Sequence, residues 1–448
     1  MNPFIFREYD IRGTFPDELN METMYVLGLS IGTYYHAHNV SRISLGRDCR
    51  LSSPELRKHL IRGLSEAGIN TLDVGMVPTP LLYFSIHSLE TGGGIQITGS
   101  HNPPEYNGIK ICLGTLSIHG KEIQQIREIQ EKGVFHKAEG TVVDKDVIPA
   151  YLDYLKSNIR CGDISRKIVV DAGNGVGGLV APDVYTGMGV SVERLYCDPD
   201  GRFPNHHPDP TIPENLKDLM TKVAETSADM GIAFDGDADR IGVVDNKGNI
   251  IWGDQLMTIF SRDILKHHPG AKIIGEVKCS QTLYDDIEKL GGHAIMWKAG
   301  HSLIKSKMRE EGALFAGEMS GHLFFADRYF GFDDAIYAGA RLIEIITREN
   351  VTLQDLLSGI PRTVTTPEIR LDCPDDRKIR VVDQMAESFR SEQDVIDIDG
   401  ARVLFQGGWG LIRASNTQPV IVLRFEAVDK ERLEEIKNIF MDKLKNVM

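Results

Sequence analysis

Residues 230–244 read MGIAFDGDADRIGVV, in which an apolar run enters an acidic loop and a second apolar run leaves it. Short apolar runs bounded by polar or glycine-rich turns predict buried β-strands. Two such strands joined by a short loop predict a hairpin-like pair that presents the loop at its tip. We therefore expect this stretch to be part of a sheet whose loop carries the chemistry.

The same pattern occurs twice more along the chain. Residues 94–111 read GIQITGSHNPPEYNGIKI, and residues 313–325 read ALFAGEMSGHLFF. A strand–helix stretch precedes each of the three pairs, at residues 43–68, 168–189 and 272–291. Repetition of one supersecondary unit predicts an α/β protein with three related mixed-sheet domains, each of which offers one loop to a central cleft.

The last segment is built differently. From about residue 366 the apolar runs are short, a helix is expected over residues 381–389, and a final helix closes the chain. We expect a smaller α+β domain here, and domain boundaries at 1–147, 148–251, 252–365 and 366–448. The final helix is expected to bury one face made of Leu433, Ile436, Ile439, Phe440 and Leu444.

Size and charge narrow the function classes. The chain has 448 residues, too many for one hydrophobic core, and a net charge of -14, which argues against binding to nucleic acid or to anionic membranes. Its six cysteines are scattered and form no Cys-x-x-Cys pair, which is typical of free thiols in a reducing compartment. The first residues contain no apolar signal core. We expect a cytoplasmic protein with no membrane partner.

The acidic loop alternates Asp235, Asp237 and Asp239. On an extended backbone these carboxylates converge, so their repulsion demands a cation, and hard oxygen ligands suit Mg²⁺. An EF-hand is excluded, because its sixth and twelfth positions require glycine and glutamate, where this chain has Arg240 and Asn246. Two alternatives stay open at this point: a solvated acidic turn, and a phosphoryl-accepting first aspartate as in haloacid-dehalogenase-like enzymes.

The loop of the first unit carries Ser100, followed by His101, with Lys110 on the returning strand. It lacks a neighbouring Asp/His pair of the protease type and the Gly-x-Ser-x-Gly elbow. A serine phosphate carries close to two negative charges and needs cations or a metal beside it. His101, Lys110 and a metal on the aspartates would supply them. The pattern favours Ser100 as a phosphoryl carrier over an ordinary turn serine.

Two further loops carry polar groups suited to a phosphorylated sugar. Alternation places Glu318, Ser320 and His322 on one side of GEMSGH, where a carboxylate and a hydroxyl can hold sugar hydroxyls and the imidazole can carry a proton. The loop RASNTQP combines a guanidinium, hydroxyls and amides, which together make a phosphate clamp. An arginine on an exposed hairpin is the alternative for that loop alone. Its candidate residues are Arg413, Ser415, Asn416 and Thr417.

One motif favours another class of protein. Residues 173–178, GNGVGG, follow a predicted strand and satisfy Gly-x-Gly-x-x-Gly, the pattern of dinucleotide-binding enzymes. It lies mid-chain within one of the repeated units, and a dehydrogenase leaves the four polar loops without a role. We interpret it as a glycine-rich turn from a strand into a helix.

Together these loops resemble the α-D-phosphohexomutases, most closely the bacterial phosphomannomutase/phosphoglucomutases. The resemblance spans the whole chain and rests on REYDIRG, TGSHNPPEYNGIK, DGDADR, EVKCS, WKAGHS, GEMSGH and WGLIRASNTQP, in that order. It implies four domains around a central cleft. It also implies an isomerase that interconverts hexose 6-phosphate and hexose 1-phosphate, with a hexose 1,6-bisphosphate as intermediate and activator. The expected assembly is a monomer or a weak homo-oligomer.

The resemblance also implies roles for individual residues. Ser100 would be the phosphoserine and would share Mg²⁺ with Asp235, Asp237 and Asp239. Phosphoryl contact or proton transfer would fall to Arg12, His101, Lys110, Arg240, His301 and His322, and which of them is the acid or base is left open. Lys278, Glu318, Ser320 and His322 would bind the sugar, and Arg413, Ser415, Asn416 and Thr417 the phosphate that is not transferred.

The branch of the family decides the expected sugar. Phosphoglucosamine mutases usually carry glutamine where Met319 stands, and a different phosphate loop, so this chain looks like the mannose and glucose branch. A site that holds the sugar's O3 and O4 should accept both sugars, which differ only at the 2-hydroxyl. A phosphoglucosamine mutase is the alternative. An NAD-dependent oxidoreductase and a non-enzymatic sugar-phosphate sensor are remoter ones.

Overall fold

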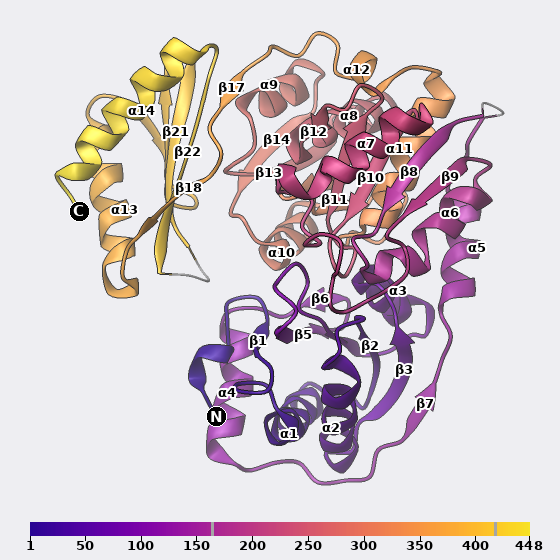
Figure 1. Ribbon diagram of the computed structural model, residues 1–448. Helices are drawn as coiled ribbons and strands as arrows, with labels where there is room; N and C mark the ends of the chain where they lie inside the picture. Colours follow the sequence, from indigo (N-terminus) through magenta and orange to yellow (C-terminus); the bar gives the residue numbers. More distant parts are fainter. Residues whose placement is uncertain (163–164, 416–418) are drawn as a thin grey trace.

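The computed structural model describes residues 1–162, 165–415 and 419–448. Within these ranges the strands form four sheets, which follow one another along the chain. The first three units stand together, while the C-terminal unit lies to one side of the third (Figure 1). The predicted α/β class, with three mixed sheets and a separate C-terminal α+β unit, is confirmed.

The first sheet has a parallel centre because helices connect its central strands, and β5 returns antiparallel beside β4. Every residue of β4 is buried, as is typical of a strand covered on both faces. In spatial order the strands are β1 (Ile11–Thr14), β5 (Tyr106–Leu113), β4 (Gly93–Ile97), β2 (Arg42–Arg47), β3 (Asn70–Met76) and β7 (Val142–Asp144), with β6 (Leu116–Ser117) beside β5.

The second and third sheets are shorter versions of the first. The second runs β12 (Ile250–Ile251), β11 (Ile241–Asp245), β10 (Met230–Phe234), β8 (Lys167–Asp171) and β9 (Ser191–Leu195). The third runs β14 (His293–Trp297), β13 (Lys272–Glu276), β15 (Phe315–Gly317) and β16 (Leu323–Phe325).

One connectivity recurs in all three sheets. A first strand (β2, β8 or β13) pairs in parallel with two neighbours, and the later of these neighbours forms an antiparallel pair with the next strand. The antiparallel pairs are β4/β5, β10/β11 and β15/β16, the three hairpins expected from the sequence. In each unit the polar loop joins the two strands of that pair, so the three loops occupy equivalent positions.

Helices fill the crossovers between strands. In the first unit they are α1 (Met21–Ala37), α2 (Ser53–Glu66), α3 (Thr79–Ser88) and α4 (Lys121–Lys132). The second unit has α5 (Ile148–Asn158), α6 (Ala181–Gly187) and α7 (Lys217–Thr226), and the third has α8 (Gly253–His267), α9 (Gln281–Lys289), α10 (His301–Glu311), α11 (Ala335–Glu349) and α12 (Leu353–Leu356). Among the helices described, none combines the length and the apolarity that crossing a bilayer requires.

The fourth sheet is antiparallel and carries two helices, α13 (Asp375–Arg390) and α14 (Lys430–Lys445). α13 is longer than the helix expected over residues 381–389. The expected apolar face of α14 is correct except at Ile439, which is 39% exposed because it lies at the margin of the stripe. The strands are β17 (Val364–Thr365), β22 (Val420–Ala427), β21 (Gly408–Ala414), β20 (Ala401–Phe405) and β19 (Asp394–Ile396), with β18 (Ile369–Asp372) beside β22.

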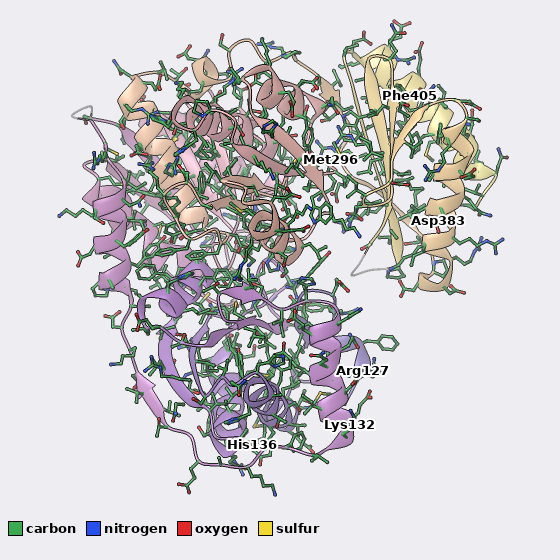
Figure 2. All side chains as sticks on the ribbon, turned by 180° about the vertical axis from the view of Figure 1, so that it is seen from behind. Arg127, Lys132, His136, Met296, Asp383 and Phe405 are labelled. Carbon is green, nitrogen blue, oxygen red and sulfur yellow. The ribbon has the colours of Figure 1, made fainter. Side chains whose placement is uncertain are left out.

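Hydrophobic packing divides the molecule unevenly. One continuous core joins Phe84 of α3, Ile232 of β10 and Phe325 of β16, so the first three units share buried contacts. The fourth unit has a core of its own. It meets the third through a small cluster around Trp409, to which Met296 of β14 contributes from the edge that faces the fourth unit (Figure 2). This apolar contact is small, and polar contacts supplement it, such as the hydrogen bonds from the buried Arg402 Nη1 to the carbonyl oxygens of Val277 (2.7 Å) and Cys279 (2.8 Å).

Candidate active site

The Ser100 loop follows β4 and points its serine at the second unit. Ser100 has a φ of +48°, a left-handed conformation that is strained for a residue with a Cβ. Its amide donates to Thr98 Oγ1 at 2.9 Å, and its Oγ donates to Asp235 Oδ2 at 2.9 Å. His101 Nδ1 lies 3.1 Å from the same Oγ. The loop therefore joins two units at the reactive hydroxyl.

Arg50, a residue outside the predicted site, holds this loop. Its side chain is fully buried and donates hydrogen bonds to the carbonyl oxygens of Ser100 (2.9 Å) and three further loop residues, and to Asp48 Oδ2 (3.1 Å). Asp48 Oδ2 also accepts from the amide of Gly99 at 3.0 Å. The other three carbonyls belong to Asn102, Pro103 and Tyr106. A guanidinium fits here because its five N–H groups spread in one plane.

The acidic loop places three fully buried carboxylates beside Ser100. Asp235 Oδ1 accepts from the amides of Asp239 and Arg240, both at 3.1 Å. Asp237 Oδ2 accepts from Lys110 Nζ at 2.8 Å, and the same ammonium pairs with Asp239 Oδ2. The hydroxyl of Thr79, at the start of α3, donates to Asp237 Oδ2 at 2.5 Å. Two units thus build the acidic cluster together.

The donor set fits a hard divalent cation. One oxygen from each of the three carboxylates lies within 4.8 Å of the others, and all three are buried. Asp237 Oδ1 and Asp239 Oδ1 have no hydrogen-bond partner among the described residues, although each is shielded from solvent. A buried carboxylate oxygen without a partner is costly, and a bound cation would satisfy it. The hydroxyl of Ser100 stands close enough to Asp235 to join such a site.

The charges of the cluster influence one another. Burial raises the pKa of Asp235 well above its ordinary value, and the charges of Asp239 and Asp237 raise it further. Burial acts in the same direction on the pKa of Asp237, but the Lys110 ammonium outweighs it and leaves that pKa below its ordinary value. Burial acts to lower the pKa of Lys110, and Asp237 and Asp239 outweigh it, so the net pKa is raised. The Lys110 ammonium pairs with two of the three carboxylates, so an excess of negative charge is left that a cation would balance.

His322 links the acidic loop to the third unit. Arg240 Nε donates to His322 Nε2 at 3.0 Å, and Asp333 Oδ2 lies 3.1 Å from His322 Nδ1. Asp333 is also outside the predicted site. Its Oδ1 pairs with Lys305 Nζ at 2.9 Å, and its Oδ2 lies 3.6 Å from His301 Nδ1. The two histidine rings are stacked, with centroids 5.4 Å apart. An arginine donor on Nε2 fixes the neutral tautomer with its proton on Nδ1, which faces the carboxylate.

Two other histidines of the predicted set are held neutral. Burial lowers the pKa of His101, and the guanidinium groups of Arg240 and Arg12 lower it further. Burial also lowers the pKa of His301, and the Lys305 ammonium adds to this. Arg12 itself pairs with Asp10 at 2.5 Å, at the start of β1. The charges that lower the pKa values of the two histidines thus come from cations of the first, second and third units.

The predicted sugar loop is tied to a turn before α10. Glu318 Oε1 accepts from the amide of Gly300 at 2.7 Å. A Cβ at Gly300 would lie 2.6 Å from the Tyr9 ring, and its φ of +131° suits only glycine. The Tyr9 hydroxyl donates to the carbonyl of Ala299 at 3.0 Å, so the first unit also holds this turn. Ser320 is half-buried on the same loop.

The remaining predicted residues lie between the third and fourth units. Lys278 Nζ lies 3.2 Å from Glu368 Oε1 and 3.7 Å from Glu276 Oε1. Arg413 Nη2 lies 2.9 Å from Asp399 Oδ2. Ser415 is buried and its amide donates to the carbonyl of Val420 at 3.0 Å. The other two predicted phosphate ligands, Asn416 and Thr417, lie outside the described residues.

The glycine-rich stretch after β8 is a turn into a short helix, as interpreted from the sequence. Its 3-10 helix spans Val176–Leu179. A Cβ at Gly175 would lie 2.7 Å from the carbonyl oxygen of Gly236, and one at Gly178 would lie 2.1 Å from that of Cys197. Glycine at position 175 therefore allows the turn to pack against the acidic loop, and glycine at position 178 allows it to pack against the segment that follows β9.

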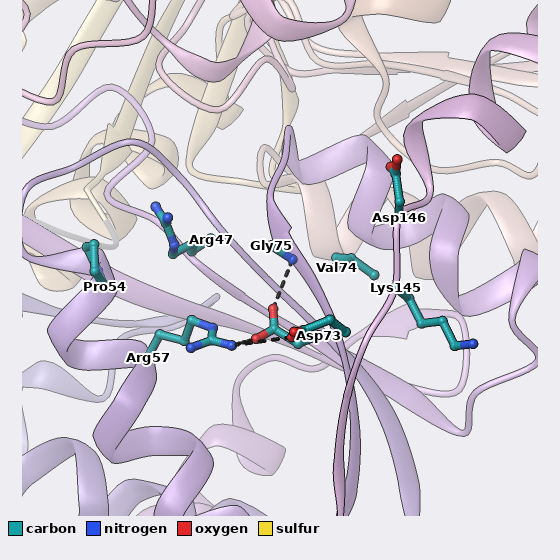
Figure 3. Close-up of a pocket in the computed structure, with 9 residues that line it drawn as sticks. Arg47, Pro54, Arg57, Asp73, Val74, Gly75, Lys145 and Asp146 are labelled. Atoms are coloured by element: carbon teal, nitrogen blue, oxygen red, sulfur yellow. Dashed lines mark hydrogen bonds and ion pairs between the residues drawn. The ribbon is translucent and has the colours of Figure 1, made fainter.

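A cavity of about 510 Å³ lies elsewhere, against the first unit (Figure 3). It is lined by both acids and bases, and Arg57 is directed at Asp73, with which it pairs. The amide of Gly75 donates to the same carboxyl group at 2.9 Å. Its lining, as far as the structure describes it, includes none of the four loops, so we assign it no part in the chemistry.

Comparisons with known proteins agree with this arrangement. Family models described as phosphoglucomutase/phosphomannomutase match the chain in four successive segments. Alpha/beta/alpha domain I matches residues 3–137, domain II residues 149–248, domain III residues 252–364 and the C-terminal domain residues 368–443.

Relatives match over nearly the full length. A phosphomannomutase/phosphoglucomutase of Pseudomonas aeruginosa is 48% identical, over 99% of this chain and 96% of its own. A phosphoglucomutase of Neisseria gonorrhoeae is 47% identical, over 97% of this chain and 95% of its own. The crystal structure of a phosphoglucomutase/phosphomannomutase family protein from Burkholderia thailandensis superposes with a TM-score of 0.94 at 42% identity, over 99% of this chain and 97% of its own. The chain therefore belongs to the phosphoglucomutase/phosphomannomutase family.

Proposed function

We propose that this enzyme is a phosphohexomutase that interconverts hexose 6-phosphate and hexose 1-phosphate through phosphorylated Ser100. The observation that carries the proposal is the hydrogen bond of 2.9 Å from Ser100 Oγ to Asp235 Oδ2, inside a cluster of three buried carboxylates. A phosphate on this oxygen would lie beside a metal held by the aspartates. The membership of the chain in the family supports the same reaction.

Phosphoryl transfer is proposed to depend on Ser100, on the three aspartates and on Lys110. Phospho-Ser100 gives its phosphoryl group to a sugar hydroxyl, and the resulting hexose 1,6-bisphosphate turns and returns its other phosphate to Ser100. Mg²⁺, when bound by Asp235, Asp237 and Asp239, would neutralise charge on the transferred group. Lys110, which pairs with two of these carboxylates, would supply a further positive charge for the same purpose.

Proton transfer is assigned to His322. Its Nε2 lone pair faces Arg240, and its Nδ1 faces Asp333. A neutral imidazole in this tautomer can accept the proton of the attacking sugar hydroxyl at Nε2 once the arginine moves to the phosphate. Arg12, His101 and His301 contribute charge and shape around the phosphate in this scheme.

Recognition of the sugar phosphate falls to the third and fourth units. Glu318 and Ser320 would hold adjacent sugar hydroxyls, with Lys278 nearby. Arg413 and Ser415, together with Asn416 and Thr417, would bind the phosphate that is not transferred. We propose domain boundaries near residues 147, 251 and 365. Residue 147 lies between the first two sheets, residue 251 ends β12 of the second sheet, and residue 365 ends β17, which pairs with β22 of the fourth sheet.

Mannose and glucose phosphates are the proposed substrates, because the relatives named above carry both names and Met319 replaces the glutamine expected of phosphoglucosamine mutases. A hexose 1,6-bisphosphate would restore the phosphate on Ser100 if it is lost. All six cysteines lie in the described part of the chain and are free thiols, which supports a cytoplasmic location.

Turnover measured with mannose, glucose and glucosamine 1-phosphates, each in the presence of Mg²⁺ and the matching bisphosphate, tests the proposal. We expect turnover of the first two and its loss in Ser100→Ala. Retained activity in that variant would remove Ser100 from the mechanism. Preference for the glucosamine compound would assign the enzyme to the alternative branch.

A further inference from the structure

Both cations that the proposed function assigns to recognition of the sugar phosphate are already paired with carboxylates of the chain. Asp399 Oδ2 lies 2.9 Å from Arg413 Nη2 and 3.2 Å from its Nε. Glu368 Oε1 lies 3.2 Å from Lys278 Nζ, and this contact lowers the pKa of Glu368 to about 2. An incoming phosphate therefore has to compete with an anion for each cation.

Asp399 is anchored independently of the arginine. The same Oδ2 accepts the amide of Ala299 at 3.1 Å, in the turn before α10. The next amide of that turn, Gly300, donates to Glu318 Oε1 at 2.7 Å. Because this hydrogen bond between the third and fourth units does not involve Arg413, Asp399 can stay in place when Arg413 swings toward a ligand.

Competition at this pair is strong because solvent reaches it poorly. The side chains of Arg413 and Asp399 are only 11% and 16% exposed. An ion pair shielded from water and salt is screened less than one on the surface. When Arg413 leaves Asp399 to bind a phosphate, Asp399 keeps only the Ala299 amide among the contacts described above. The free energy of the broken ion pair opposes binding of the phosphate.

We propose that Asp399 is a positioning residue that serves as the counter-anion of Arg413, competing with the substrate's non-transferred phosphate for the guanidinium and so helping that phosphate to leave. The inference rests on the proposed function, in which the bisphosphate must leave the clamp and turn before its second phosphate reaches Ser100. A clamp without a competing anion would bind substrate and bisphosphate more tightly alike, which lowers KM without raising turnover.

Asp399→Asn tests this directly. The amide keeps an oxygen for the Ala299 amide but removes the charge that competes for Arg413. We expect the Kd of glucose 6-phosphate, measured by calorimetry on full-length enzyme in the Ser100→Ala background to prevent turnover, to fall about fivefold, the effect of one partly screened ion pair. In the Ser100 enzyme KM and kcat should both fall, because release becomes slower.

Asp397→Asn is the matched control. Asp397 lies two residues away, is 60% exposed and pairs with Arg390 at 2.7 Å, so its removal changes net charge equally without touching Arg413. We expect its Kd and kcat to equal those of the parent enzyme. Asp399→Ser, which keeps a hydroxyl acceptor, replaces Asp399→Asn if the latter does not fold.

The outcomes separate this inference from the function on which it rests. A Kd that is unchanged or raised in the Asp399 variants would show that the carboxylate only orients Arg413. Tighter binding with an undiminished kcat would show that the carboxylate has no part in release of the phosphate. Either result overturns the inference while the mutase reaction stands. Absence of mutase turnover in the wild-type enzyme would instead remove the proposed function.

Discussion

Arg50→Lys should disorder the Ser100 loop while it preserves the positive charge. The side chain of Arg50 makes five hydrogen bonds, one to Asp48 Oδ2 and four to the carbonyl oxygens of Ser100, Asn102, Pro103 and Tyr106. A lysine ammonium has three donors, so at least two of these buried acceptors lose their partner. A buried acceptor without a partner costs about 1–3 kcal/mol, so the substitution should lower the free energy of unfolding by about 2–6 kcal/mol.

The effect on turnover should be larger than loss of stability alone explains. Because the carbonyl of Ser100 is one of the four, the hydroxyl loses its fixed direction toward Asp235. Misplacement of a reacting group by about 1 Å can reduce the rate about a hundredfold. We would measure urea unfolding and kcat on the same preparations, with kcat taken at a temperature where each variant is fully folded.

Arg62→Lys is the matched control for this substitution. Arg62 lies on the solvent face of α2, is 63% exposed and pairs with Glu66. Its replacement should change stability by no more than about 0.5 kcal/mol and leave kcat unaltered. If Arg50→Lys unfolds at the same urea concentration as wild type and keeps its kcat, Arg50 does not hold the loop.

Two further predictions concern the metal and a buried acid. Removal of divalent cations with EDTA should abolish turnover and lower the melting temperature, because Asp237 Oδ1 and Asp239 Oδ1 have no hydrogen-bond partner in the described part of the chain. Addition of Mg²⁺ should restore both, and full turnover in EDTA would refute a metal role. Burial raises the pKa of Asp334 from 3.8 to about 6, so between these values the folded protein keeps a proton that the unfolded chain has lost. The contribution of this group to stability is therefore greatest below about pH 4 and is lost as the pH rises through 6, by up to about 3 kcal/mol. The difference in unfolding free energy between wild type and Asp334→Asn, followed by urea titration across this range, should change with that sign, and a difference independent of pH would contradict it.

The repeated architecture is predictable from the sequence because it depends on local patterns. Apolar runs on either side of a polar loop specify a hairpin wherever both strands are buried, and β4/β5, β10/β11 and β15/β16 all follow that rule. The single misplaced residue in the last helix, Ile439, shows the limit of this reasoning. A helical stripe predicts which residues share a face, while the width of the buried strip depends on the sheet against which it packs.

Residues that act across the fold are harder to predict. Arg50 reaches a loop that begins about fifty residues later in the chain. A signal does exist, since Arg50 follows β2 and Ser100 follows β4, and these strands are parallel neighbours whose ends meet at one edge. The sequence contains less of a signal for Asp333 and Asp399, because each is a single acid whose partners come from other segments. Their positions depend on how the units assemble, which a local pattern does not encode.

The most direct test of the account is the site of phosphorylation. Intact-mass measurement of the purified chain after incubation with glucose 1,6-bisphosphate and Mg²⁺, followed by fragmentation, should find one phosphoryl group on Ser100. The Ser100→Ala chain should carry none and show no turnover. A phosphoryl group on Asp235 instead, or a Ser100→Ala enzyme that still interconverts the two hexose phosphates, would contradict the central claim.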